Sequence, residues 1–253
     1  MPSPQPTPQP PHPPLTTYYE READRRAWVL DIFERSSADY DRVERLMALG
    51  TGSWYRRRAL RRAGLRPGMT VLDIGSGTGL VACEAARIVG DATRVRGVDP
   101  CSGMMDQAKV PAGVRLLTGT AEAIPAEDGC ADFLSMGYAL RHVGDLPVAF
   151  AEFHRVLRPG GRLCLLEITR PESAWYRALL KTYMRRVVPF AAGLVARTRA
   201  TPTLMRYYWD TIELCVPPQS ITAALEAAGF MDIDRYVELG IFSEYRATKP
   251  AIS

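Results

Sequence analysis

The stretch that decides the fold is "VLDIGSGTG", Val71 to Gly79, which is followed after about twenty residues by "RGVDP", ending at Asp99 and Pro100. The apolar run predicts a buried strand, and glycines at alternate positions let the backbone turn sharply and pass close to a ligand. An acid at the end of the next strand can accept hydrogen bonds from both hydroxyls of a ribose. Together these features indicate a nucleotide site at the first strand-to-helix turn.

The spacing of this loop argues against two common nucleotide motifs. The dinucleotide fingerprint G-x-G-x-x-G requires glycine at position 80, where this chain has Leu80, so an NAD-linked oxidoreductase is disfavoured. No lysine follows the loop, so it is not a phosphate loop of the G-K-[ST] kind. Asp73, in the strand before the loop, suits a cationic amino group of the ligand.

Composition limits the class of protein. Of the 253 residues, 47% are hydrophobic and 24% are charged, which is ordinary for a globular protein. The five cysteines are scattered and pair with no histidine at a metal-like spacing, so we expect reduced thiols, a cytoplasmic location and no metal. The net charge of +4 is carried almost entirely by arginine and supports nucleic-acid binding only weakly. An N-P-P-[YF]-type tetrad is absent after the fourth expected strand, which also disfavours nucleic-acid methylation.

The patterning divides the chain into three parts. Residues 1–17 are rich in proline and are predicted to form a disordered, extended tail. Residues 18–62 have apolar residues at helical spacing, and residues 63–253 alternate between strand and helix patterns. Residues 170–217 interrupt this alternation and predict a helical cap over the carboxyl edge of the sheet, with a break at Pro189.

The alternation predicts an α/β fold with a mostly parallel, seven-stranded sheet and helices on both faces. Strands are expected at 70–74, 94–99, 114–118, 131–136, 161–169, 231–237 and 241–248. Helices are expected between them, notably at 79–89, 146–157 and 219–228.

The loop and Asp99 resemble motif I and its acidic successor in class I S-adenosylmethionine-dependent methyltransferases. "GTAEAIP" (119–125) resembles the loop that frames adenine in that class. The resemblance implies the Rossmann-like class I methyltransferase fold and S-adenosyl-L-methionine as the cofactor. The cofactor-binding residues that it implies are Asp73, Gly75, Ser76, Gly77, Thr78, Gly79, Asp99, Pro100, Met104, Thr120, Ala121, Glu122 and Met136.

Other segments narrow the resemblance to the UbiE/MenG quinone C-methyltransferase family. "GYALRHV" (137–143) and "LEITRP" (166–171) resemble its G-x-x-L-R-N-V and L-E-x-x-R-P segments. "LRPGGRL" (157–163) resembles the segment that leads into the fifth strand, and residues 38–60 match the N-terminal region of that family in register.

Three positions depart from the family pattern. Thr120 stands where the adenine loop usually has aspartate, and His142 stands where the family has asparagine. "YYWDTI" (207–212) replaces the family's Y-L-P-E-S-I. The last two changes fall where the substrate should lie, so a different methyl acceptor stays open.

The chemistry assigns candidate catalytic residues. Methyl transfer from a sulfonium needs donor and acceptor held in line, and a phenol carbon becomes nucleophilic when a neighbouring hydroxyl loses its proton. Arg141 could stabilise that phenolate, and His142 could be the base or simply a capped turn residue. Tyr40 could close over the methionine end or the acceptor, or only pack in the core.

The first functional hypothesis is C-methylation of a quinol or hydroxylated aromatic, with a lipophilic or aromatic small molecule as acceptor. The second is a secondary-metabolite methyltransferase working at oxygen, nitrogen or carbon on another acceptor. The third, of another class, is a catalytically silent nucleotide-binding partner protein. The basic amphipathic piece at 174–206 could be a solvated cap, a cover over a substrate tunnel, or a patch for peripheral contact with a membrane surface.

Overall fold

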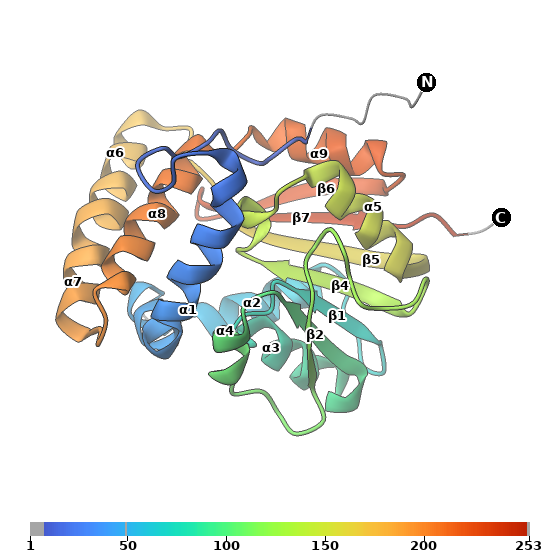
Figure 1. The fold of residues 1–253 in the computed structure, drawn as a ribbon. Coiled ribbons are helices and arrows are strands. Elements are labelled where there is room, and N and C mark those ends of the chain that lie inside the picture. The colour runs from blue at the N-terminus through green and yellow to red at the C-terminus, as the bar shows by residue number, and fades with distance from the viewer. Residues whose placement is uncertain (1–7, 49, 252–253) are drawn as a thin grey trace.

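The computed structural model describes residues 8–48 and 50–251. Within them, seven strands form one sheet in the order β3-β2-β1-β4-β5-β7-β6 (Figure 1). The strands are β1 (Val71–Ile74), β2 (Val95–Asp99), β3 (Arg115–Thr118), β4 (Ala131–Gly137), β5 (Leu157–Ile168), β6 (Met231–Glu238) and β7 (Phe242–Thr248). Neighbours from β3 to β5 pair in parallel, whereas β7 is antiparallel to both β5 and β6. The predicted seven-stranded, mostly parallel sheet is confirmed.

Helices cover both faces of this sheet, as predicted. On one face, Phe150 and Phe153 of α5 (Leu146–Val156) pack with Leu225 of α9 (Pro218–Ala227) in a buried apolar cluster. On the other face, α2 (Gly52–Arg62) and α3 (Leu80–Val89) form a second cluster over β1 and β4. The central strands read as apolar runs because both of their faces are buried.

The order of the strands creates a crevice. Strand β1 lies between β2 and β4, so the chain leaves the carboxyl ends of these strands in opposite directions. In open α/β sheets this divergence leaves a ligand site outside the strand ends. Short helices line the connections there and elsewhere: η1 (Ala92–Arg94), α4 (Ser102–Asp106) and η2 (Leu140–His142).

A separate helical layer flanks this crevice (Figure 1). It consists of α1 (Glu22–Met47), α6 (Ala174–Thr182), the π-helical turn η3 (Tyr183–Val187), α7 (Val188–Val195) and α8 (Ala200–Leu214). Helix α1 packs against both α8 and α4, and buried aromatic side chains join α1 to α8. None of the helices in the described part of the chain is long and apolar enough to cross a membrane.

The predicted break at Pro189 is wrong. Residues of α6 continue through η3 into α7 with helical dihedral angles at both junctions. Proline has no N–H to donate to the preceding turn, and the π-helical turn that ends at Val187, two residues before Pro189, accommodates the missing bond without ending the helix.

The predicted disordered tail is also wrong for residues 8–17, while residues 1–7 lie outside the described part. Gln9 and Pro11 accept backbone hydrogen bonds from Leu146 (3.1 Å) and Val216 (2.7 Å). His12 and Leu15 are both buried, and the Leu15 side chain joins the apolar cluster between α1 and α8. Proline removes a donor but leaves its carbonyl oxygen free to accept, so a proline-rich segment can still bind along a surface that offers N–H groups.

We expect Leu15→Ala to destabilise the whole domain, because a buried leucine contributes about 2 kcal/mol or more to folding. The melting temperature should fall by about 4–8 °C, measured by circular dichroism. Leu194→Ala is the matched control: Leu194 is exposed on α7, and its truncation should leave the melting temperature unchanged. Equal, negligible shifts in both variants would mean that the tail does not dock.

Candidate active site

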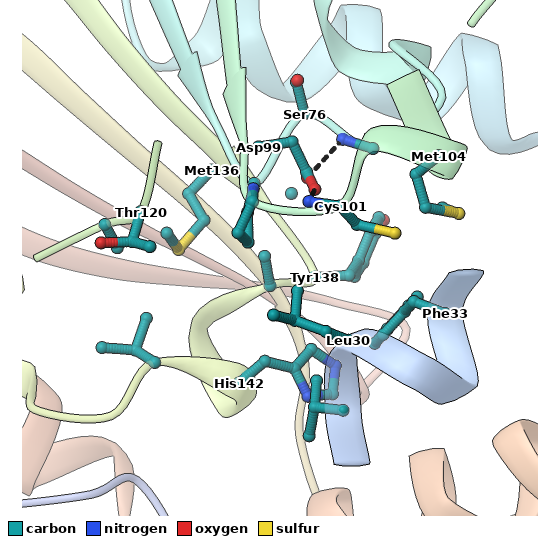
Figure 2. A pocket seen from close by; sticks show the side chains of 18 of the residues that line it. Leu30, Phe33, Ser76, Asp99, Cys101, Met104, Thr120, Met136, Tyr138 and His142 are labelled. Atoms are coloured by element: carbon teal, nitrogen blue, oxygen red, sulfur yellow. Dashed lines mark hydrogen bonds between the residues drawn. The ribbon is translucent and has the colours of Figure 1, made fainter. Parts of the chain in front are cut away.

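A cavity of about 550 Å³ lies at the carboxyl ends of β1, β2 and β4, next to α1 (Figure 2). Most of the predicted site residues meet there. Those that line it are Tyr40, Gly75, Ser76, Gly77, Thr78, Asp99, Pro100, Met104, Thr120, Ala121, Glu122, Met136 and His142. The other three predicted residues, Asp73, Gly79 and Arg141, are not among its lining residues in the described part of the chain.

The glycine loop turns as sharply as the sequence predicted. Gly75, Gly77 and Gly79 have φ angles of +64°, +52° and +82°, a region that favours glycine. A Cβ on Gly75 would lie 2.5 Å from the Cβ of Ala139, and one on Gly79 would lie 2.3 Å from Val110 Cγ1. The third glycine, Gly79, is therefore needed because its backbone packs closely against Val110 in the segment after α4, and not because it contacts a ligand.

Asp99 ends β2 with its carboxylate held in place. The backbone N–H groups of Gly77 and Cys101 donate to Oδ2 and Oδ1, at 2.7 and 2.8 Å (Figure 2). Burial raises the pKa of Asp99, and these two hydrogen bonds oppose that rise. A carboxylate has about four acceptor positions. Asp99 can thus still accept from the hydroxyls of a bound ribose.

Asp73 lies behind the loop rather than in the cavity. Its Oδ1 accepts a hydrogen bond of 2.7 Å from Ser135 Oγ, and its Oδ2 has no partner among the described residues. Burial raises the pKa of Asp73 to about 7. The structure therefore gives no direct support to the predicted contact between Asp73 and an amino group of the ligand.

Helix α1 ties the nucleotide end of the site together. Asp41 accepts a hydrogen bond of 2.6 Å from Thr78 Oγ1 in the glycine loop, and Glu34 accepts one of 3.0 Å from the backbone of Gly103 in α4. Glu122, also a lining residue, accepts a hydrogen bond of 2.6 Å from Gly144 N and joins the loop that contains Thr120 to the loop after β4. Helix α1, which lies outside the sheet, thus forms part of the cavity wall.

Arg141 does not lie where its predicted role requires it, because it is not among the residues that line the cavity. It is fully buried, and its Nε donates to Glu167 Oε2 at 2.7 Å while its Nη1 donates to Thr211 Oγ1 at 2.8 Å. Leu140 N donates to the other oxygen of the same carboxylate at 2.9 Å. Arg141 joins β5 to α8 and turns away from the cavity, because its guanidinium finds a buried carboxylate there.

His142, the next residue, does line the cavity (Figure 2). Its ring stacks on Tyr207 at 5.6 Å between centroids and meets the rings of Phe33 and Tyr208 edge-on, at 5.2 and 5.8 Å. Neither ring nitrogen has a hydrogen-bond partner among the described residues. Burial first, and then the charge of Arg141, hold the pKa of His142 well below its usual value. The imidazole is therefore neutral at pH 7, with one nitrogen able to donate and the other able to accept.

Tyr40 lies at the same end of the cavity and is hydrogen-bonded to Tyr208, with 2.8 Å between their hydroxyl oxygens. Burial raises the pKa of both phenols, so both stay protonated at neutral pH. Their pair connects α1 to α8 across the cavity wall.

Sequence reasoning did not name several of the residues that line the cavity: Arg25, Val29, Leu30 and Phe33 of α1, and Arg56 of α2. Tyr208 also lines it and lies within "YYWDTI" (207–212), the segment that the sequence placed near the substrate. One signal was present for Arg25. The buried residues of α1 recur at spacings of three and four, and Arg25 occupies one of those positions. A helical pattern predicts which side chains are buried but not which groups they contact, so it did not predict that α1 borders a cavity.

Comparisons with known proteins agree with this geometry. The model of the ubiE/COQ5 methyltransferase family matches residues 20–249. The chain is 29% identical over 225 residues to a ubiquinone/menaquinone biosynthesis C-methyltransferase UbiE of Shewanella halifaxensis, covering 86% of this chain and 88% of the relative. It is 30% identical over 236 residues to the protein of that description from Teredinibacter turnerae, covering 90% and 93%.

Solved structures of methyltransferases share the fold. A S-adenosylmethionine-dependent methyltransferase from Thermotoga maritima, described as a possible histamine N-methyltransferase, aligns with a TM-score of 0.61 at 23% identity. That alignment covers 87% of this chain and 99% of the other. A S-adenosylmethionine-dependent methyltransferase from Aquifex aeolicus aligns with a TM-score of 0.56 at 22% identity, covering 76% and 88%.

The site fits S-adenosylmethionine, the methyl donor of the matched family. Gly75 and Gly77 line the cavity with left-handed φ angles, and Asp99 presents an oriented carboxylate at the end of β2. Ser76 is another lining residue, and its Oγ is buried without a hydrogen-bond partner among the described residues. These residues would hold the nucleoside, and the donor would bring an electrophilic methyl group to the adjoining part of the cavity.

Asp99→Ala should weaken S-adenosylmethionine binding by about 2 kcal/mol, roughly 30-fold in Kd, because charge-assisted hydrogen bonds are lost. Isothermal titration calorimetry measures this directly. Asp106→Ala is the matched control, since Asp106 is an exposed acid on α4 outside the cavity lining. Unchanged affinity in a folded Asp99→Ala variant would refute the ribose assignment.

Proposed function

The chain belongs to the ubiE/COQ5 methyltransferase family, and we propose that this S-adenosylmethionine-dependent methyltransferase methylates a ring carbon of a quinol or another hydroxylated aromatic molecule. The observation that supports this most directly is the position of His142. A neutral imidazole with no hydrogen-bond partner borders the cavity beside apolar side chains. Such an imidazole can form a hydrogen bond with the hydroxyl of an acceptor whose ring is otherwise apolar.

The cavity wall supports an aromatic, lipophilic acceptor. Helix α1 contributes Val29, Leu30 and Phe33 to the lining, and the loop after β4 contributes Val143. Figure 2 shows Leu30 and Phe33 near His142. Apolar walls with few polar groups bind aromatic ligands by burial and orient them through those polar groups. The rest of the chemistry is alignment, because donor and acceptor must lie about 3–3.5 Å apart and in line.

We assign His142 a positioning role rather than the role of base that the sequence suggested. A base whose pKa is held low accepts a proton poorly, since catalytic efficiency follows basicity. Burial and the neighbouring Arg141 charge lower the pKa of this imidazole. The neutral ring can instead exchange a hydrogen bond with the acceptor hydroxyl and orient the ring carbon toward the methyl group.

The alternative is methylation of a non-quinone acceptor at oxygen, nitrogen or carbon. It is supported by His142, which replaces the asparagine of the resembled family, and by "YYWDTI" (207–212). Tyr208 of this segment lines the cavity, so the change falls next to the acceptor. An oxygen acceptor would place its own hydroxyl, rather than a ring carbon, in line with the methyl group.

The test is transfer of a labelled methyl group to a short-chain quinol with one unsubstituted ring carbon. We expect a C-methylated product, identified by NMR, and an O-methylated product would instead support the alternative. His142→Asn should alter acceptor KM and preference while the acid limb of the rate profile stays in place. If His142 were the base, its loss would lower kcat by about 10²–10⁴-fold and flatten that limb.

His154→Asn provides the matched control for this substitution. His154 lies on α5, where its ring packs edge-on against Phe230 at 5.4 Å, away from the cavity lining. Its replacement should leave acceptor KM and preference unchanged. No methyl transfer to any phenolic acceptor, with the donor still bound, would refute the proposed acceptor class.

We further propose that the outer face of α6 and α7 contacts a membrane surface and brings the enzyme to a lipophilic acceptor. Trp175, Leu179, Phe190 and Leu194 are 71%, 55%, 71% and 72% exposed on this continuous helical stretch. The exposed basic residues of the same part of the chain are Arg185, Arg186, Arg197 and Arg199. An apolar helix face bordered by arginine is attracted to anionic lipid headgroups. Two copies of this face would instead bring like charges together.

Vesicles that contain anionic lipid should bind the protein, and the double variant Trp175→Ser/Phe190→Ser should bind at least about tenfold more weakly, because buried aromatic area is lost. Cosedimentation measures this. The control Val148→Ser/Met231→Ser changes two exposed apolar residues of α5 and β6 and should bind normally. Equal binding of both double variants would refute this membrane-contacting face.

A further inference from the structure

Arg25 is a buried cation at the cavity that the proposed function leaves without a role. It occupies the buried stripe of α1 together with Val29 and Ile32, and its side chain lines the cavity. Arginine stays charged when buried, so its charge must be balanced by partners or felt by whatever enters the cavity.

The hydrogen-bond partners of Arg25 balance that charge only partly. Its Nη2 donates to the carbonyl oxygens of Arg141 (2.9 Å) and Val143 (3.3 Å) and lies 3.2 Å from His12 Nε2. These groups are neutral acceptors. Its Nη1 donates to Glu22 Oε1 at 3.1 Å, but the Glu22 side chain is 42% exposed and is therefore screened by water.

Arg141 provides the contrast. Its counter-ion, Glu167, is only 2% exposed and receives hydrogen bonds on both carboxylate oxygens, so the charge of Arg141 is balanced inside the protein. The positive field that remains in the cavity comes more from Arg25 than from Arg141. The role that the sequence suggested for Arg141, to stabilise a phenolate, therefore suits Arg25 of α1 instead.

Two neighbours of Arg25 also have polar atoms without partners among the described residues. The atoms are the hydroxyl of Tyr207 and the two ring nitrogens of His142. The Nε of Arg25 also has no hydrogen-bond partner among the described residues. The His142 and Tyr207 rings are stacked. The charge of Arg25 lowers the pKa of both side chains, although burial is the larger influence and raises the pKa of Tyr207. Unpartnered donors in a positive field suit a negatively charged oxygen.

We propose that Arg25 and His142 form the site for an anionic oxygen of the methyl acceptor, so that a hydroxylated aromatic is bound as its phenolate. The O–H bond of the acceptor breaks, its electron pair stays on the oxygen, and the proton passes to water. It does not remain on His142, because Arg25 and Arg141 both disfavour the imidazolium. This inference rests on the proposed function for the class of acceptor and makes Arg25 the residue that favours ionisation.

The test uses 4-nitrophenol, whose phenolate absorbs visible light, bound to the protein saturated with S-adenosylhomocysteine. At a pH below the pKa of the free probe, the ratio of ionised to neutral probe should be at least about tenfold higher when bound, because an opposite charge at contact distance shifts a pKa by one unit or more. Arg25→Gln should abolish this gain, and Arg25→Lys should keep part of it. Arg35→Gln, which removes an exposed arginine of the same helix, should keep all of it.

A second variant, Glu22→Gln, is needed because Arg25→Gln could also disturb the loop after β4, whose carbonyl groups at Arg141 and Val143 accept hydrogen bonds from Arg25. Removing the counter-charge should raise the ionised fraction of the bound probe above that of the unmodified protein. A purely structural Arg25 would not produce opposite changes in these two variants.

The proposal is overturned if 4-nitrophenol does not bind, if it binds without a gain in ionisation, or if Glu22→Gln leaves the ionised fraction unchanged. None of these measurements involves methyl transfer, so their failure leaves the proposed C-methylation standing. Conversely, if no methyl group were transferred to quinols, the measurements with 4-nitrophenol would still decide whether the anion site exists.

Unchanged affinity for S-adenosylhomocysteine in Arg25→Gln would show that the site serves the acceptor, whereas a loss comparable to that of Asp99→Ala would assign Arg25 to the donor instead.

Discussion

The end of the cavity that His142 borders depends on one buried ion pair, Arg141 with Glu167. The carboxylate at the end of β5 accepts from the Leu140 amide and the Arg141 guanidinium, and the same guanidinium reaches Thr211 on α8. The pair thereby sets the turn after β4 and the position of α8 at once. Removing one member of a buried pair leaves an unbalanced charge that costs about 3–5 kcal/mol, so neither element can move independently. His142 and Tyr208, which border the cavity, take their places from this arrangement.

Helix α1 is the second support of the site, and it serves both ends. Its acids Glu34 and Asp41 hold α4 and the glycine loop at the proposed nucleotide end, while Arg25, Leu30 and Phe33 line the cavity at the proposed acceptor end. The sheet and its glycine loop are shared with methyltransferases of distant sequence. The walls that could distinguish one acceptor from another come from α1 and α8, which pack on that sheet from outside. The proposed donor site thus belongs to the shared fold, whereas the proposed acceptor site combines His142, from the turn after β4, with side chains of the added helical layer.

Electrostatics separate the two ends of the cavity. Asp99 places a carboxylate at the end of β2, while Arg25 and the neutral His142 lie at the other end. Little water reaches these side chains, so their charges act over longer distances than they would in solvent. A neutral imidazole beside a cation is a poor base but a good hydrogen-bond partner. The charge of Arg25 therefore determines in part what His142 can do.

The sequence by itself determined the sheet, the glycine loop and Asp99, because each depends on local rules: strand periodicity, the left-handed φ angles open to glycine, and the place of an acid directly after a strand. Only the tertiary structure decided where Asp73, Arg141 and Arg25 point, and that residues 8–17 bind along the surface of the domain. A polar side chain turns toward whichever partner the folded chain brings near it, and the partners here are distant in sequence: Glu167 and Thr211 for Arg141, and the Leu146 and Val216 amides for the tail. No local pattern carries that information, because burial predicts that a charge must be satisfied but not which group satisfies it.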